Sequence, residues 1–264
     1  MKLTKILSSV ACFALVGAFM FTSCDGNIGS DDIVVTEGGA KASINAENTS
    51  TTDYRRTLSK SSTFSKKEVT STITFENQTK SSENGVMGLA FDYHTTTDSA
   101  GDTVYDFGVV ALKAASGKML AYISYYKNVG ADYISGSTDN FCDKNGVKIG
   151  DEGCLATETK IIPTNSDSWK PLDAKYYAFD EEKGTVVSAI NVAVQNDGSF
   201  LVKIAKDVAG LKGTKGTDYV EYTVPTVNTS VDTEKATSFA YYANVYKATP
   251  SGSNTLKGTW NTSF

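Results

Sequence analysis

Met87-Gly-Leu-Ala-Phe-Asp-Tyr93 and Tyr105-Asp-Phe-Gly-Val-Val-Ala-Leu112 decide the fold class. In the first stretch, large apolar residues alternate with Gly, Ala and Asp, which is the period of a half-buried β-strand. The second stretch is apolar on both of its faces. Ser116-Gly117 predicts a tight reversal into a third strand, Met119 to Lys127. We therefore expect three consecutive antiparallel strands.

Elsewhere in the chain, further runs of alternating apolar and polar residues predict about ten strands in all. The clearest hairpin turn is Asn196-Asp-Gly-Ser199, because Asp-Gly tolerates the positive φ angles of tight turns. Helical periodicity is scarce, and one short helix or turn is expected over Ala205–Leu211. We predict an all-β fold built as an antiparallel β-sandwich. The other expected strands cover residues 69–75, 175–179, 185–195, 200–206, 219–224, 237–247 and 256–263.

The strands Gly88–Tyr93, Tyr105–Leu112 and Ala121–Tyr126 resemble the paired strands of concanavalin A-like jelly rolls, the group of lectins, laminin G domains and glycoside hydrolases. The resemblance implies a jelly-roll β-sandwich and favours a carbohydrate-binding role. It transfers no catalytic residue, because the acidic motifs of that group have no counterpart in this sequence.

The N-terminal segment predicts export. Lys2 and Lys5 precede a short apolar run, as in a secretory signal peptide. Phe21-Thr-Ser-Cys24 resembles a bacterial lipobox, which implies lipidation of Cys24 by palmitate and other acyl chains. The alternative is an ordinary signal peptide. The resemblance implies a lipoprotein of the bacterial cell envelope, at the cell outer membrane or surface rather than the inner membrane.

Composition suggests three regions: a signal peptide (1–23), a flexible tether (24–67) and a β-sandwich domain (68–264). The tether is rich in Ser, Thr, Asn, Asp and Gly, which bury little apolar surface. Ile33–Val35 is its one apolar interruption and could add an edge strand to the domain. The formal net charge of −5 makes nucleic acid an unlikely partner, since phosphates would be repelled.

Two candidate features share the irregular middle of the chain. Cys142 and Cys154 form an even pair in an exported protein and predict a disulfide, with two free buried thiols as the alternative. Oxygen-bearing residues in the same loop are weak candidates for calcium, with Asx turns as the alternative. These candidates are Asp139, Asp143, Asn145, Asp151 and Glu152.

Aromatic residues give the best ligand hypothesis. Tyr122, Tyr126, Trp169 and Tyr176 could form a stacking platform, because Tyr and Trp are amphipathic and frequent at interfaces. On a strand, Tyr122 and Tyr126 share a face with Ser124. Tyr177, Tyr241, Tyr242 and Tyr246 are further candidates, and the alternative for most of these rings is core packing.

No catalytic residue is assigned. Asp92, Asp102, Asp106 and Glu76 are weak candidates for paired carboxylates, and His94 is the one histidine. We therefore expect a membrane-anchored lipoprotein whose sandwich binds a glycan or a partner protein without catalysis. The alternatives are a jelly-roll glycoside hydrolase or lyase, and a structural or antigenic surface protein.

Overall fold

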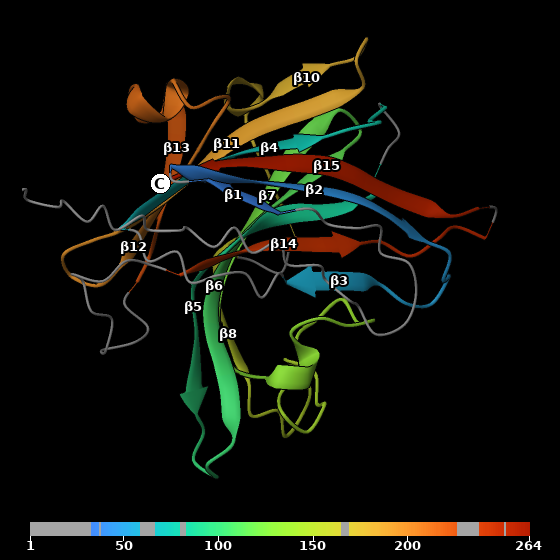
Figure 1. Ribbon diagram of the computed structural model, residues 1–264, viewed down its shortest axis with the longest axis vertical. Helices are drawn as coiled ribbons and strands as arrows, with labels where there is room; N and C mark the ends of the chain where they lie inside the picture. Colours follow the sequence, from blue (N-terminus) through green and yellow to red (C-terminus); the bar gives the residue numbers. More distant parts are fainter. Residues whose placement is uncertain are drawn as a thin grey trace, which may run out of the picture.

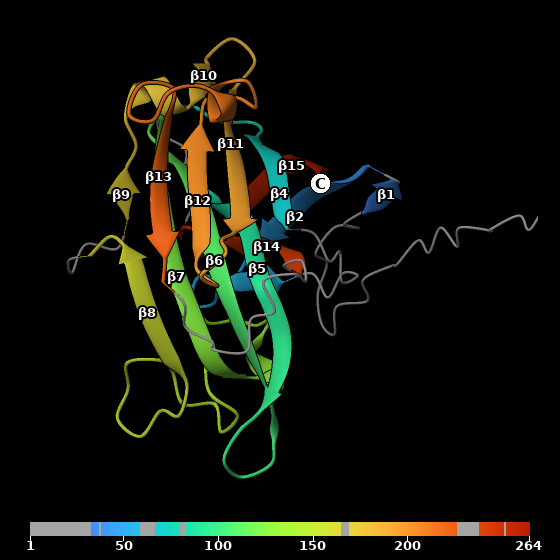
Figure 2. The same cartoon turned by 90° about the vertical axis from the view of Figure 1, so that its left-hand side faces the viewer.

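Two antiparallel sheets pack face to face in the computed structural model, which describes residues 33–36, 38–58, 67–79, 83–164, 169–225, 238–250 and 252–264. Figure 2 shows the sheets as two layers, with β4, β11, β12 and β13 in front of β5, β6 and β7. This arrangement confirms the expected all-β antiparallel sandwich. The jelly-roll connectivity stays a prediction.

We call the first sheet sheet A, and its strands run in the order β1-β2-β15-β4-β11-β12-β13, with β10 also paired to β11. β2 and β15 lie near the two ends of the chain and pair along ten positions. The strands are β1 (Val34–Thr36), β2 (Gly39–Asn48), β4 (Glu68–Phe75), β10 (Ala178–Asp180), β11 (Thr185–Val194), β12 (Phe200–Ala205), β13 (Tyr219–Val224) and β15 (Asn254–Ser263).

The second sheet, sheet B, has the order β3-β14-β5-β6-β7-β8, and β9 also pairs with β7. Its three central strands are 13 residues long, and the β5–β6 hairpin extends past sheet A at the lower end of Figure 1. The strands are β3 (Arg55–Leu58), β5 (Gly85–Thr97), β6 (Thr103–Ala115), β7 (Lys118–Gly130), β8 (Thr157–Ile162), β9 (Lys170–Pro171) and β14 (Phe239–Val245).

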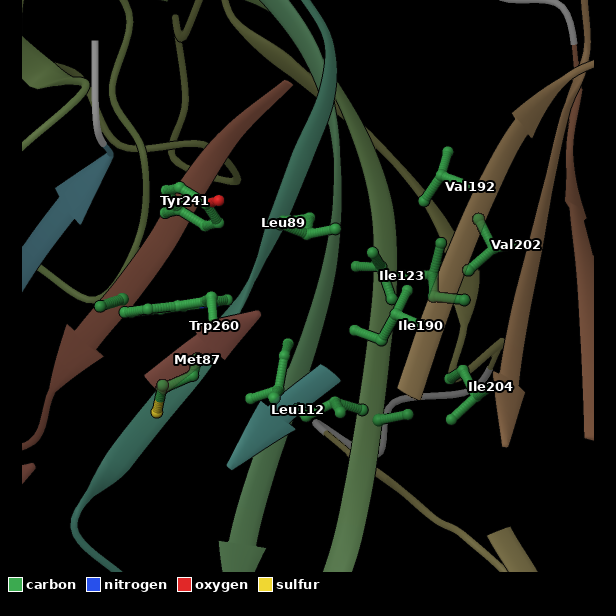
Figure 3. Packing of buried hydrophobic residues seen from close by; sticks show 14 of the residues in the cluster. Met87, Leu89, Leu112, Ile123, Ile190, Val192, Val202, Ile204, Tyr241 and Trp260 are labelled. Carbon is green, nitrogen blue, oxygen red and sulfur yellow. The ribbon is translucent and has the colours of Figure 1, made fainter. Parts of the chain in front are cut away.

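The main core lies between the sheets. Figure 3 shows Ile123 from sheet B next to Ile190 from sheet A, and Leu112 and Val202 belong to the same core. Trp260 is buried in this core, and its indole Nε1 donates a hydrogen bond of 3.0 Å to the Gly88 carbonyl.

The predicted tether is corrected by the structure, because residues 34–58 contain β1, β2 and β3. β2 alternates Ala40, Ala42, Ile44 and Ala46 inward, so its apolar face consists mostly of small side chains. The small side chains hide the apolar signal in the sequence. The alternative edge strand is present as β1, which pairs with β2 at the edge of sheet A. Cys24 and the signal peptide lie outside the described residues.

Other boundaries also differ from expectation. The polar segment 95–102 is strand at residues 95–97, because β5 continues to Thr97, and forms the turn before β6 at residues 98–102. The strand expected over 175–179 is replaced by η2 (Ala174–Tyr176) and the start of β10. The helix expected over Ala205–Leu211 is the 3₁₀ turn η3 (Gly210–Lys212). Both predicted hairpin turns are confirmed, since Ala115 pairs with Lys118 and Val194 with Phe200.

Candidate functional site

The outer face of sheet B is apolar, although it points away from the main core. Small side chains form its centre, among them Ala90, Ala111 and Ala240, and all three are buried. A sheet face turned to water would carry polar residues at these alternate positions. The outer face must therefore be covered by other groups.

Part of the cover comes from the segment between β7 and β8, which begins with η1 (Ala131–Tyr133). Ile134 and Phe141 of this segment are buried on the outer face. The Phe141 ring lies 5.0 Å from that of Phe107 and 4.7 Å from that of Tyr126, both in edge-on contacts. Such contacts stabilise aromatic pairs beyond the area they bury.

Arg56 of β3 holds this segment in place, and it is only 1% exposed. Its guanidinium donates hydrogen bonds to the carbonyls of Thr138 (2.8 Å) and Tyr133 (2.6 Å) and a longer one to Ile134 (3.4 Å). It also lies over the Phe141 ring at 4.1 Å. Burial lowers the pKa of Arg56, with smaller opposing effects from nearby tyrosines.

The predicted disulfide is not present, and both Cys142 and Cys154 are free thiols. The Cys154 thiol instead donates to the carbonyls of Val147 (3.3 Å) and Ala156 (3.4 Å). The two ends of the loop are joined by the buried Asp143 carboxylate rather than by sulfur.

Asp143 accepts backbone N–H groups from Asn145 (2.8 Å), Val147 (3.0 Å) and Leu155 (2.8 Å). Burial alone would raise the pKa of Asp143, but these three donors outweigh burial and lower it. The side chain thus acts as an Asx turn that also reaches the far end of the loop.

The calcium candidates do not converge. Asp143 is occupied by backbone donors, and Asp139 accepts a hydrogen bond from the Asn244 side chain at 3.1 Å. Within the described ranges, no group of three acidic, histidine or cysteine side chains is placed to hold a metal ion. The Asx-turn alternative fits Asp143, whereas the exposed Asp151 and Glu152 do not join it in a metal site.

Beyond the segment between β7 and β8, the outer face carries a group of aromatic rings. Trp169 directly precedes β9, whose Lys170 pairs with Ala121, so Trp169 lies beside Tyr122. Their ring centroids are 5.6 Å apart and tilted by 45°. On the other side, Tyr246 and Tyr54 meet edge to face at 5.7 Å. These four rings are half-buried.

Lys113 of β6 lies between the two ring pairs. Its ammonium is 5.1 Å from the Trp169 ring and 5.6 Å from the Tyr246 ring, and it forms an ion pair of 2.7 Å with Glu83. The Lys113 side chain is only 11% exposed.

Glu158 of β8 completes this cluster. Its carboxylate accepts a hydrogen bond from the Tyr122 hydroxyl. Burial raises the pKa of Glu158, while Lys160 acts in the opposite direction. We use the name "aromatic face" for the set of Tyr54, Lys113, Tyr122, Glu158, Trp169 and Tyr246.

Among the described residues, three fully buried side-chain polar atoms lack a hydrogen-bond partner, and all three belong to strands of sheet B: the Tyr93 hydroxyl, Ser124 Oγ and Asn244 Oδ1. The Ser124 hydroxyl approaches Tyr126, and Asn244 approaches Tyr242, but neither contact has hydrogen-bond geometry. Buried polar groups in native proteins usually have partners, so their concentration on one face is informative.

The predicted platform is therefore partly present. Tyr122 and Trp169 come together as expected. Tyr126 shares their face but is only 8% exposed, because Phe107 and Phe141 cover its ring. Tyr176 lies elsewhere, on η2, where its hydroxyl donates to the Gly216 carbonyl at 3.0 Å.

Tyr246, one of the further candidates, also belongs to the aromatic face. The sequence interpretation missed Tyr54, Lys113 and Glu158: Tyr54 falls in the predicted tether, and Lys113 and Glu158 are single charges on strands that nothing in the sequence connects. The alternation of β7 was the usable signal, since it places Tyr122 and Tyr126 outward and Ile123 and Tyr125 in the main core.

The carboxylates considered for catalysis have structural partners instead. Asp92 accepts a hydrogen bond of 2.5 Å from Tyr125 and lies 3.5 Å from His94. Asp106 accepts the backbone N–H of Asn128 at 2.8 Å.

The other two carboxylates form ion pairs. Asp102 pairs with Lys144, which also binds Asp98 at 2.7 Å, and Glu76 pairs with Lys257 at 3.0 Å. None of the four candidate carboxylates belongs to the aromatic face.

No protein-family model, curated protein or solved structure matches this chain. Among the described residues, no helix has the length and apolar character needed to cross a membrane. The functional argument therefore depends on the chemistry of the aromatic face.

Proposed function

We propose that this protein is a lipoprotein of the bacterial cell envelope whose β-sandwich binds a glycan on the aromatic face without catalysing a reaction. The observation that carries the proposal is the half-buried Tyr122–Trp169 pair next to the Glu158 carboxylate. Aromatic rings offer flat apolar surfaces to the C–H groups of sugars, and carboxylates accept strong hydrogen bonds from hydroxyls. This combination suits a ligand that is apolar on one face and hydroxylated at its edge.

Binding is tested with a panel of oligosaccharides measured by titration calorimetry. Trp169→Ala removes most of the stacking surface, so we expect at least about tenfold weaker binding, or about 1.4 kcal/mol. The matched control is Tyr219→Ala, because Tyr219 is also half-buried but lies on sheet A, where Lys203 covers its ring at 4.8 Å. Equal affinity of the wild type and Trp169→Ala would contradict the proposal, and capture of a protein on this face would favour the partner-protein alternative.

The anchor is tested separately. Mass spectrometry of the mature N-terminal peptide should show acyl chains on Cys24, and Cys24→Ser should release the protein from membranes. One acyl chain anchors only weakly, so more than one is expected. Because β1 begins at Val34, an extended chain from Cys24 spans at most about 35 Å. The folded domain would thus lie close to the lipid surface rather than at the end of a long tether.

A glycoside hydrolase is the second candidate, and Glu158 is the observation that favours it. A half-buried carboxyl with a raised pKa next to aromatic rings is typical of a general acid. Hydrolysis ordinarily needs a second carboxylate, and Glu83 on this side is held by Lys113. Release of reducing ends from the bound oligosaccharide, abolished by Glu158→Gln, would replace the binding proposal with this one.

A further inference from the structure

Two of the cations next to the aromatic face, Lys113 and Arg56, are engaged by the protein itself, whereas Lys160 is exposed and lies two residues from Glu158 on β8, where it acts on the Glu158 carboxyl. Lys113 is paired with Glu83 and enclosed by two rings, so an anionic ligand would have to displace Glu83 to reach it. Arg56 is directed at backbone carbonyls and is buried beneath the segment between β7 and β8. A ligand carboxylate or sulfate would therefore lose its hydration without gaining a matched cation from Lys113 or Arg56.

Glu158 is the half-buried charged group of the aromatic face that remains available to a ligand, and its carboxylate offsets the charge of the neighbouring Lys160. Tyr122 occupies one lone pair of Oε1, and an ionised carboxylate offers about four acceptor sites. Its remaining acceptor capacity favours a hydrogen-bond donor such as a sugar hydroxyl. A negative ligand group at the same place would be repelled.

Two of the buried unpaired polar atoms, Ser124 Oγ and Asn244 Oδ1, add no positive charge that would favour an anionic ligand. Ser124 Oγ lies between Tyr122 and Tyr126 along β7 and can donate, whereas Asn244 Oδ1 can only accept. The Asn244 amide is oriented by its donor bond to Asp139, which leaves Oδ1 as the unpaired atom. Both atoms are fully buried, so they lie beneath the surface that a ligand would contact.

We propose that the aromatic face takes an uncharged, hydroxyl-rich sugar and that Glu158 accepts a hydrogen bond from one of its hydroxyls. This inference rests on the proposed function, since it names the class of glycan bound there. Trp169 and Tyr122 supply the stacking surface, and Glu158 selects against anionic sugars at the edge of that surface.

The test uses the full-length chain and two sets of probes: neutral gluco-, xylo-, manno- and galacto-oligosaccharides, and anionic oligogalacturonate, alginate and sulfated chondroitin fragments. We expect calorimetry to detect at least one neutral probe and none of the anionic probes. Glu158→Gln should bind that neutral probe about tenfold more weakly. Glu182→Gln, an exposed glutamate beside the β10–β11 turn, should bind like the wild type.

Acidification provides a readout that a purely structural role of Glu158 would not give. Affinity should fall as Glu158 becomes protonated in the wild type and stay flat in Glu158→Gln, with circular dichroism showing both folded. Trp169-dependent binding of an anionic probe would overturn this inference and leave glycan binding standing. Binding of neither set would overturn the proposed function itself, and unchanged neutral binding by folded Glu158→Gln would refute the role of Glu158.

Discussion

Replacing Arg56 with methionine removes a buried cation from the junction between β3 and the segment that covers the outer face of sheet B. Two of its hydrogen bonds, to Thr138 and Tyr133, are 2.8 Å or shorter. Hydrogen bonds from charged donors contribute about 1.5–3 kcal/mol each, so the gross loss is about 3–6 kcal/mol. Methionine avoids burying a charge and is flexible enough to keep contact with Phe141. We therefore expect Arg56→Met to lower the free energy of unfolding by about 2–4 kcal/mol.

The matched control is Arg55→Met on the same strand. Arg55 is half-buried and donates to the Glu47 carbonyl at 2.8 Å, so its loss should cost only about 0.5–1 kcal/mol. Urea unfolding followed by tryptophan fluorescence measures both variants, and a change in midpoint with a constant slope reports stability. Hydrogen exchange at Gly136, whose N–H bonds to the Arg56 carbonyl, reports whether the covering segment has loosened.

Equal losses in the two variants would refute this reasoning, because the buried guanidinium would then matter no more than a part-exposed one. An unaffected Arg56→Met protein would also revive the view that residues 24–67 are a tether outside the domain. A large loss confined to Arg56→Met would place β3 within the cooperative fold.

Three further predictions follow from single side chains. Asp143→Asn should lower the free energy of unfolding by about 1–3 kcal/mol at neutral pH, because an amide cannot accept all three N–H groups. Since the pKa of Asp143 is lowered in the fold, urea melts should show the stability difference between the variant and the wild type shrinking as pH falls through that pKa. The hydrogen bond to Asp92 raises the pKa of His94, so protonated His94 should stabilise the fold fully below about pH 6.5 and lose this effect as pH rises through its folded-state pKa. Thermal melts of His94→Gln should therefore differ from those of the wild type only on the acidic side. In protein beginning after Cys24, thiol titration should count two free thiols, and Cys154 should react before Cys142 because Cys154 is part-exposed and Cys142 is buried. A count of zero would restore the disulfide.

The strands whose inward residues are large could be predicted from the sequence, and those with small ones could not. β4, β6, β11 and β12 carry Val, Ile or Phe on their buried faces, and their positions agree closely with expectation. β2 has the same period of two, but alanine carries too little hydrophobic signal to separate it from a polar linker. Its small side chains match the large Trp260, which pairs with Ala42 on the neighbouring strand. β2 thus lacks large apolar residues because its small side chains pack against the large side chain of a neighbouring strand.

The candidate site was only half predictable for a related reason. Alternation along β7 places Tyr122 outward, but the contact with Trp169 depends on β9 pairing with β7 across a long segment. Glu158 and Lys113 come from two further strands, and no local pattern specifies which strands become neighbours. For the cysteine pair, a local pattern was present but misleading. The close spacing of Cys142 and Cys154 predicts a disulfide that closes the loop, whereas hydrogen bonds to Asp143 close it in the structure.

The position of the aromatic face follows from a mismatch within the sandwich. Sheet B is apolar on both faces, but sheet A covers only the inner face of sheet B. β3 and the segment between β7 and β8 cover part of the outer face, and Arg56 fixes them there. Among the described residues, the remainder is closed by half-buried rings lying beside small residues such as Ala111. A purely structural sheet would carry polar residues at those positions, as sheet A does with Thr70, Thr72 and Thr74. Retaining apolar and aromatic side chains where water reaches them is costly without a ligand, which is why this face carries the functional proposal.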